Sequence, residues 1–154
     1  GMIYATSFGS TVDVYEIDPQ KFEITRTLDL NISNFYSYGS TSLFIDEDSN
    51  SLYLQHGLND RLFEIDIDTF RIKRILKGRV HAMRMIKDNA RDVLYISSFF
   101  YGKVIALDLK TNKQVWKVHV GGKPYGLAIY GNFLFVNSRA GIVRIDLDEL
   151  WKRS

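Results

Sequence analysis

The stretch Val104-Ile105-Ala106-Leu107-Asp108 decides the fold, because the chain of 154 residues contains four segments of this kind. Each is a short apolar stretch that ends in an aspartate. The four aspartates are Asp18, Asp66, Asp108 and Asp146. Their spacing of 48, 42 and 38 residues indicates a repeated unit of about 40 residues, which is typical of one blade of a β-propeller.

Three further strand-like segments accompany this stretch in a complete unit. Along a complete unit, an apolar piece such as 83–85 comes first and a match to Leu94-Tyr95-Ile96 comes second. The stretch that ends in the aspartate is third, and an alternating segment such as 70–74 follows the aspartate. Apolar residues alternate with period two and do not recur at i, i+3, i+4 and i+7, so a solenoid of helix pairs is excluded. The unit is therefore an antiparallel meander of four strands, a (innermost) to d (outermost).

The strand count predicts an all-β fold that forms an incomplete ring. The four units comprise about residues 2–30, 38–77, 81–120 and 123–154 of one domain. The first unit lacks strand a, and the last lacks most of strand d. Because the two end blades would expose apolar faces, we expect either a homodimer that closes one ring of roughly eight blades or the C-terminal part of a longer propeller that needs its missing half.

The same repeats resemble the YVTN-type β-propeller family. Residues 103–113 and 120–129 follow its pattern, and Tyr95-Ile96-Ser97-Ser98 and Phe135-Val136-Asn137-Ser138 stand where that repeat places its naming tetrapeptide. The resemblance is strongest over residues 81–147. It implies a propeller used as a surface-layer, binding or redox-associated module rather than one shared chemistry, and it favours a location outside the cytoplasm.

Composition excludes several classes of site. The chain has no cysteine, so disulfides, thiolate metal sites and cysteine nucleophiles are absent. Its 20 basic and 18 acidic side chains leave a net charge of +2. No apolar run approaches the roughly 18 residues of a membrane span. We expect no cofactor and no membrane-spanning segment.

A small-molecule site is expected at the mouth of the central tunnel, where strands a begin. The sequence places five candidate ligand-binding residues there: Thr41, Arg79, His81, Lys123 and Tyr125. Cations, an imidazole and a phenol suit a small anionic or hydroxylated ligand. Different residue types at equivalent positions are also what a water-filled tunnel tolerates.

The repeated aspartates favour turn formation over metal binding. Equivalent positions in successive blades lie far apart, whereas Ca²⁺ needs its oxygen ligands within about 2.6 Å. Each aspartate is expected to accept backbone N–H bonds in the turn between strands c and d. No G-x-S-x-G, H-E-x-x-H or P-loop pattern occurs, so we name no catalytic or metal-ligating residue.

Basic residues gather between Arg71 and Arg91. Arg71, Lys73 and Lys77 alternate along an expected outer strand, where lysine and arginine prevent pairing between sheets. Their scatter does not favour nucleic-acid binding. Arg84 stands in an innermost strand, so we expect it to pair with a carboxylate across a blade boundary or to contact a ligand.

These observations favour a non-enzymatic binding or scaffold module that closes a ring by homodimerisation. Two alternatives remain open. One is a metal-dependent, lactonase-like hydrolase that uses tunnel-mouth residues, and the other is a fragment of a larger redox-associated propeller.

Overall fold

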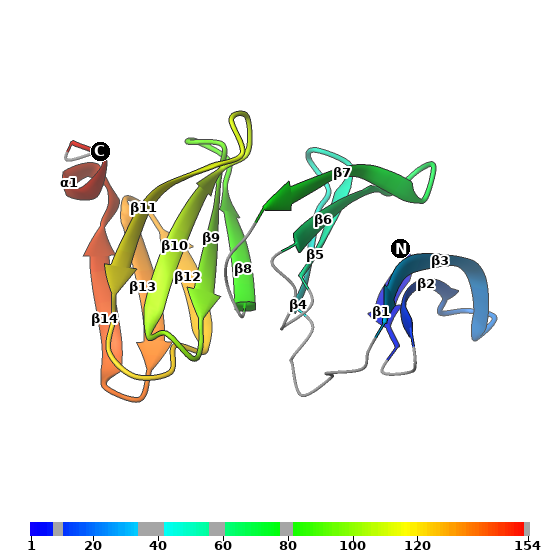
Figure 1. Ribbon diagram of the computed structural model, residues 1–154, viewed down its shortest axis with the longest axis horizontal. Helices are drawn as coiled ribbons and strands as arrows, with labels where there is room; N and C mark the ends of the chain where they lie inside the picture. The colour runs from blue at the N-terminus through cyan, green and yellow to red at the C-terminus, as the bar shows by residue number, and fades with distance from the viewer. Residues whose placement is uncertain (8–10, 34–41, 56–60, 78–81, 153–154) are drawn as a thin grey trace.

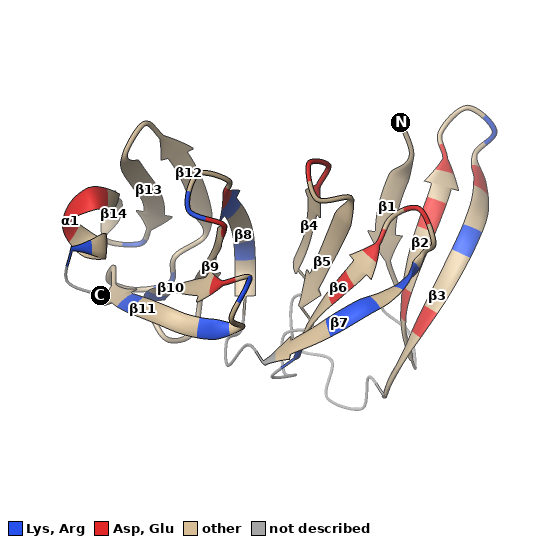
Figure 2. Cartoon of the chain, turned by 90° about the horizontal axis from the view of Figure 1, so that it is seen from above, with Lys and Arg blue, Asp and Glu red and all other residues tan. Residues whose placement is uncertain are grey.

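The computed structural model describes residues 1–7, 11–33, 42–55, 61–77 and 82–152. Their strands form four antiparallel sheets of three, four, four and three strands, as the sequence predicts. Figure 1 shows sheets 1 and 2 side by side, with sheets 3 and 4 overlapping at the C-terminal side, and Figure 2, seen from above, separates the four sheets in chain order. Within the described residues, no helix is long and apolar enough to cross a membrane.

Each sheet is a meander of strands that are consecutive in the chain. Sheet 1 contains β1 (Ile3–Thr6), β2 (Thr11–Asp18) and β3 (Glu23–Ser33). Sheet 2 contains β4 (Ser42–Asp46), β5 (Ser51–Gln55), β6 (Arg61–Asp66) and β7 (Arg71–Lys77). Sheet 3 contains β8 (Ala82–Asp88), β9 (Val93–Ser98), β10 (Lys103–Asp108) and β11 (Lys113–His119). Sheet 4 contains β12 (Gly126–Tyr130), β13 (Phe133–Ser138) and β14 (Gly141–Asp146).

The repeated aspartates form the expected turns. Asp18 accepts hydrogen bonds from the backbone N–H groups of Gln20 and Lys21, and Asp108 accepts them from Lys110 and Thr111. Asp66 and Asp146 make the corresponding bonds in their own turns. These carboxylates therefore fix the chain where it leaves β2, β6, β10 and β14.

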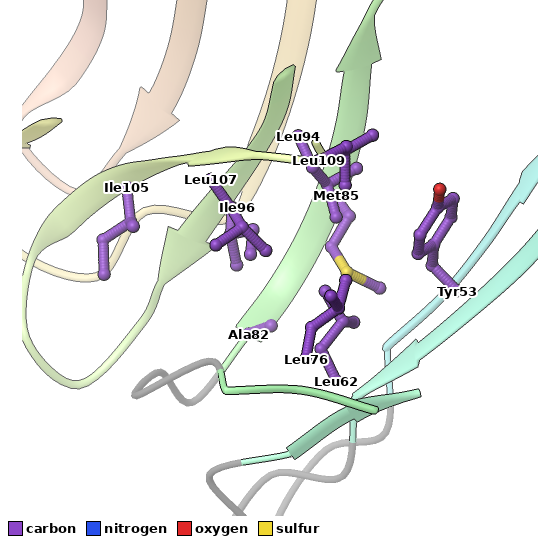
Figure 3. Close-up of a cluster of buried hydrophobic side chains, with 10 residues drawn as sticks. All are labelled: Tyr53, Leu62, Leu76, Ala82, Met85, Leu94, Ile96, Ile105, Leu107 and Leu109. Carbon is purple, nitrogen blue, oxygen red and sulfur yellow. The ribbon is translucent and has the colours of Figure 1, made fainter. Parts of the chain in front are cut away.

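The core lies between neighbouring sheets, because each strand presents alternate side chains to the sheets on its two sides. Figure 3 shows the cluster between sheets 2 and 3, where Tyr53, Leu62 and Leu76 meet Met85, Leu94 and their neighbours. Similar clusters join sheet 1 to sheet 2 and sheet 3 to sheet 4. Each joint between sheets thus depends on apolar side chains from both.

The end of the chain differs from the expected outer strand. Leu147–Trp151 form a short helix, α1, instead of a partial strand d. Leu147, Leu150 and Trp151 are spaced i, i+3 and i+4, so one helix face packs into the core between sheets 3 and 4. Asp146 caps the helix by accepting hydrogen bonds from the N–H groups of Asp148 and Glu149. The expected partial strand d was therefore wrong for this segment, whereas the exclusion of a solenoid of helix pairs holds.

Candidate functional site

Arginine side chains connect successive sheets: two of them donate to backbone oxygens of the next sheet, and Arg91 of sheet 3 pairs with Asp148 in α1, which follows sheet 4. Arg26 on β3 pairs with Glu16 on β2 and donates to the backbone oxygens of Ile67 at 2.8 Å and Asp68 at 2.7 Å in sheet 2. Its guanidinium also lies 4.7 Å from the ring centroid of Phe70. Hydrogen bonding to Arg26 lowers the pKa of Glu16 to about 2.

The second joint repeats the arrangement. Arg74 on β7 pairs with Glu64 on β6 and donates to the backbone oxygen of Leu109 in sheet 3 at 2.6 Å. The third joint replaces this pair with Ala106 opposite Trp116. We call the face of a sheet that points toward the preceding sheet in the chain its leading face, and the opposite face its trailing face. In the first two joints, an arginine of the trailing side of one sheet binds the leading side of the next sheet.

The leading face of sheet 1 is uncovered. Ile3, whose cross-strand partner Ile17 precedes the first repeated aspartate, is 50% exposed, whereas the equivalent Leu52, Leu94 and Leu134 are fully buried. Phe22 is 89% exposed, whereas Phe70, which occupies the same turn position in sheet 2, is only 6% exposed. Both side chains are therefore exposed at positions that the inner sheets bury.

The trailing face of sheet 4 is uncovered in the same way. Ile142 is 77% exposed, whereas the equivalent Leu62 and Val104 are fully buried. Arg144 lies on this face, with its guanidinium 4.8 Å from the ring centroid of Phe133. Within the described part of the chain, Arg144 forms no ion pair. This face therefore offers an exposed apolar side chain and a cation that stacks on Phe133.

A groove of about 430 Å³ between sheets 2 and 3 contains four cationic side chains and two carboxylates. Its charges pair with one another or with neighbours. Lys73 lies 3.5 Å from a Glu64 oxygen, and Lys110 lies 3.7 Å from an Asp92 oxygen. This groove is best explained as part of the joint between the sheets.

A second candidate surface combines aromatic rings with lysines. This aromatic–lysine cluster consists of Phe99, Phe100, Tyr101, Lys103, Lys123 and Tyr125. The Phe99 ring contacts Tyr125 edge to face at 5.0 Å and Phe100 at 5.2 Å. The Lys123 ammonium lies 5.3 Å from the Phe99 ring centroid, and the Lys103 ammonium lies 5.8 Å from that of Tyr101.

Backbone contacts hold the two loops of this cluster together. The Val120 N–H donates to the Gly102 oxygen at 2.9 Å, and the Tyr125 N–H donates to the Asn137 oxygen at 2.8 Å. A Cβ atom on Gly102 would lie 2.7 Å from the Gly121 oxygen, so only glycine permits this close approach. The cluster is thus built on the ends of the strands in sheets 3 and 4.

The structure brings together two of the five predicted tunnel-mouth residues. Lys123 and Tyr125 meet through Phe99. The other three, Thr41, Arg79 and His81, lie outside the described residues. Sequence reasoning missed the three consecutive aromatics 99–101, although such a run in the loop between strands b and c occurs in no other unit and was a readable signal.

The expected pairing of Arg84 with a carboxylate across a blade boundary is not found among the described residues, and the alternative, contact with a ligand, stays a prediction. The Arg84 side chain is exposed and donates to the Met83 carbonyl at 2.9 Å, and within the described ranges it forms no ion pair. The cation that crosses a sheet boundary is Lys87 on the same strand, 2.5 Å from Asp46 on β4. Alternation accounts for the difference, because the two residues are three positions apart and so lie on opposite faces of β8, and Lys87 is on the face toward sheet 2.

No group of three or more His, Asp or Glu side chains in the described segments is placed to hold a metal ion. The three histidines cannot be compared, because His56 and His81 lie outside those segments. His119 ends β11 and is exposed.

Comparison with solved structures supports the architecture. Hydrazine synthase from Kuenenia stuttgartiensis matches 92% of this chain with a TM-score of 0.70 at 14% identity, and glutaminyl cyclase from Myxococcus xanthus matches 95% with 0.63 at 13%. A protein of unknown function from Bacteroides caccae matches 96% with 0.68 at 12%.

The chain spans 44%, 62% and 60% of the lengths of those three proteins, respectively. No family model matches the sequence, and no curated protein matches it significantly. At these identities the likeness concerns the fold alone: the chain is all-β, and its four antiparallel sheets are similar to those of propeller-type proteins.

Proposed function

We propose that this chain is a β-propeller segment that acts as a non-enzymatic binding and scaffold module, and that two copies close one ring. The observation that carries the proposal is the difference in exposure between equivalent positions of the end sheets and the inner sheets. Ile3 and Ile142 are exposed at the two ends, while their counterparts in the inner sheets are fully buried. A face built like an inner face is stable when another sheet covers it.

Complementary side chains favour a second copy as the covering sheet. In the first joint, an arginine of the trailing face covers Phe70 and donates to backbone oxygens of its turn. The trailing face of sheet 4 offers Arg144, and the leading face of sheet 1 offers Phe22 in the position of Phe70. Arg144 lies on β14 in the position of Glu16 rather than that of Arg26, so a contact between Arg144 and Phe22 of a second copy would use the same two side-chain types from a different strand.

A twofold arrangement satisfies both faces of both copies. Sheet 4 of each copy packs on sheet 1 of the other, which makes two identical contacts, and two copies supply eight sheets. Contacts between unlike faces close a ring when the rotation permits, and propellers of up to about eight blades are usual. The similarity of the repeats to the YVTN type supports the same architecture.

The energetics also favour closure by a pair. Covering one large apolar side chain contributes about 1.5–3 kcal/mol, and Ile3, Phe22, Ile24 and Ile142 are among the exposed large apolar residues. Ile24 is left out of the sum, because its counterpart Ile72 stays 38% exposed in an inner sheet. Ile3, Phe22 and Ile142 together gain on the order of 4 kcal/mol or more for each contact before association costs. A closed pair makes two contacts for a single loss of translational and rotational freedom.

Light scattering and native mass spectrometry test the proposal. We expect a mass twice the chain mass of 17.8 kDa. Ile142→Asp should shift the measured mass to that of a single chain, and it should leave the chain folded because Ile142 is exposed. Phe22→Lys and Arg144→Glu should each weaken the dimer, and the double variant should restore it through a new ion pair. The control Phe100→Asp changes an exposed ring outside both faces and should leave the dimer intact.

A stable monomer of the unmodified chain with a cooperative melt would contradict ring closure by a second copy. It would favour the alternative in which these faces meet the rest of a larger propeller. Calorimetric titration with calcium or zinc tests the hydrolase alternative. Tight stoichiometric binding of either ion would contradict the non-enzymatic module.

A further inference from the structure

We propose that the aromatic–lysine cluster is a binding surface for an acidic oligosaccharide. Sugar rings stack on Phe100, Tyr101 and Tyr125, and carboxylates of the sugar chain contact Lys103 and Lys123. This inference goes beyond ring closure, because the cluster lies on loops at the strand ends and not on either uncovered sheet face.

The exposed rings provide the apolar part of the surface. Phe100, Tyr101 and Tyr125 are all exposed, and large exposed aromatic side chains that gather in one place mark a binding surface. An aromatic ring has a negatively polarised face. The C–H groups on the flat side of a sugar ring are weakly positive, so they pack on that face while the sugar hydroxyls remain free for the tyrosine hydroxyls.

The two lysines supply the preference for an anion. Each ammonium lies over an aromatic ring, and neither forms an ion pair with any residue that the structure describes. Lysine on such a surface is a point charge available to a carboxylate. Lys123 also has a φ of 53°, a backbone conformation that is costly for a non-glycine residue and is held here by its surroundings.

The cluster is organised before a ligand arrives. Phe99 stands between Phe100 and Tyr125 at interplanar angles of 83° and 72°, and the contact of Gly102 with Gly121 fixes the two loops. A surface ordered in advance loses little conformational entropy on binding. An open surface of this kind suits an extended chain better than a small molecule that must be mostly enclosed.

The ratio of rings to charges favours a sugar chain over a single-stranded nucleic acid. Four aromatic rings accompany two lysines. Single-stranded nucleic acids carry a phosphate at every nucleotide, and their binding depends strongly on cations that follow the backbone. An acidic oligosaccharide carries fewer charges for each apolar face, which matches this surface.

Calorimetry with hexagalacturonate at low salt tests the proposal, with maltohexaose and a thymidine hexanucleotide as comparison ligands. We expect saturable binding of hexagalacturonate and weaker binding of the other two. Tyr101→Ala should weaken binding by about tenfold, and Lys123→Met by about threefold with a smaller dependence on salt. Lys152→Met removes an exposed lysine that caps the end of α1, remote from the cluster, and should change nothing.

Three results would overturn the proposal: no saturable binding of hexagalacturonate, tighter binding of the nucleotide, or equal affinity for the Tyr101→Ala and unmodified proteins. The Ile142→Asp variant separates the test of ligand binding from the test of ring closure. It should bind hexagalacturonate with unchanged affinity whether or not the unmodified chain is a dimer, and circular dichroism of each variant confirms that it is folded.

Discussion

The ion pair between Lys87 and Asp46 gives a sharp prediction about how the sheets are joined. The two groups lie 2.5 Å apart, with side chains only 10% and 5% exposed, and they belong to the innermost strands of sheets 3 and 2. The positions equivalent to Lys87 in sheets 2 and 4 are Ile45 and Ile129. Lys87→Ile therefore introduces the residue that two other sheets already accommodate.

The expected cost follows from what remains buried. Removing one partner of a buried pair costs about 3–5 kcal/mol, because the other charge stays without compensation. Asp46 keeps a hydrogen bond from the Ser49 hydroxyl, so we expect the low end, about 3 kcal/mol. Lys110→Met is the control, because Lys110 is largely exposed and 3.7 Å from Asp92, and its pair should contribute at most about 1 kcal/mol.

Urea unfolding followed by tryptophan fluorescence at fixed protein concentration measures both values. The double variant Lys87→Ile, Asp46→Leu should recover most of the loss, because it removes both charges from the joint. Lys87 also lowers the pKa of Asp46 against the opposing effect of burial. In Lys87→Ile, only the hydrogen bonds from Ser49 oppose the effect of burial, so the pKa of Asp46 should be higher than in the unmodified protein, and the deficit should shrink as the pH falls and Asp46 is protonated.

If Lys87→Ile costs no more than Lys110→Met, the buried pair does not stabilise this joint and the reasoning is wrong. A double variant less stable than the single one would refute the account of the uncompensated charge. A deficit that stays constant from neutral pH to pH 3 would show that Asp46 ionisation is not its cause.

Three further predictions concern the joints and the loops. The pKa of Glu16 is about 2 instead of 4.5, so above pH 4.5 its ionised form should contribute at most about 3 kcal/mol to the free energy of unfolding. This contribution is lost as the pH falls toward 2. Glu16→Gln should therefore reduce the change of the urea midpoint over this pH range. Gly102→Ala should cost about 1–3 kcal/mol, because φ is 61° and the new Cβ meets the Gly121 oxygen, and loss of stability below that range in thermal melts would contradict the close approach. Leu147→Ala, which empties a fully buried position, should cost about 2–5 kcal/mol in urea unfolding, whereas a neutral effect would mean that α1 does not pack on the core.

The number and order of the strands could be predicted because each unit repeats the same pattern of residues. Four aspartates at similar spacing mark four turns, and each apolar triplet upstream must then be the neighbouring strand. The same logic correctly predicted three strands in the first and last sheets. It did not predict α1, because Leu147, Leu150 and Trp151 belong to no repeat and their helical spacing is confined to a single turn.

Single side chains were harder to predict. Arg84 and Lys87 are both cations in one innermost strand, and only the register of β8 against β9 distinguishes the exposed position from the packed one. The joints show the same limit. Glu16 with Arg26 and Glu64 with Arg74 recur at equal spacing, but their contacts with the backbone of the next sheet require the stacking of sheets, which no local pattern encodes.

Repetition also separates residues that build this fold from residues that give one unit its own role. A side chain needed at every joint recurs with the repeat, as the aspartates and the buried residues before them do. A residue that differs in type from its counterparts in the other units and is buried with a partner, such as Lys87, contributes to one joint only. Phe100, Tyr101 and Lys123 depart from the repeat, are accessible, and lie together on a surface that no joint requires. That combination is why we propose a ligand for this surface rather than for the repeated geometry of the sheets.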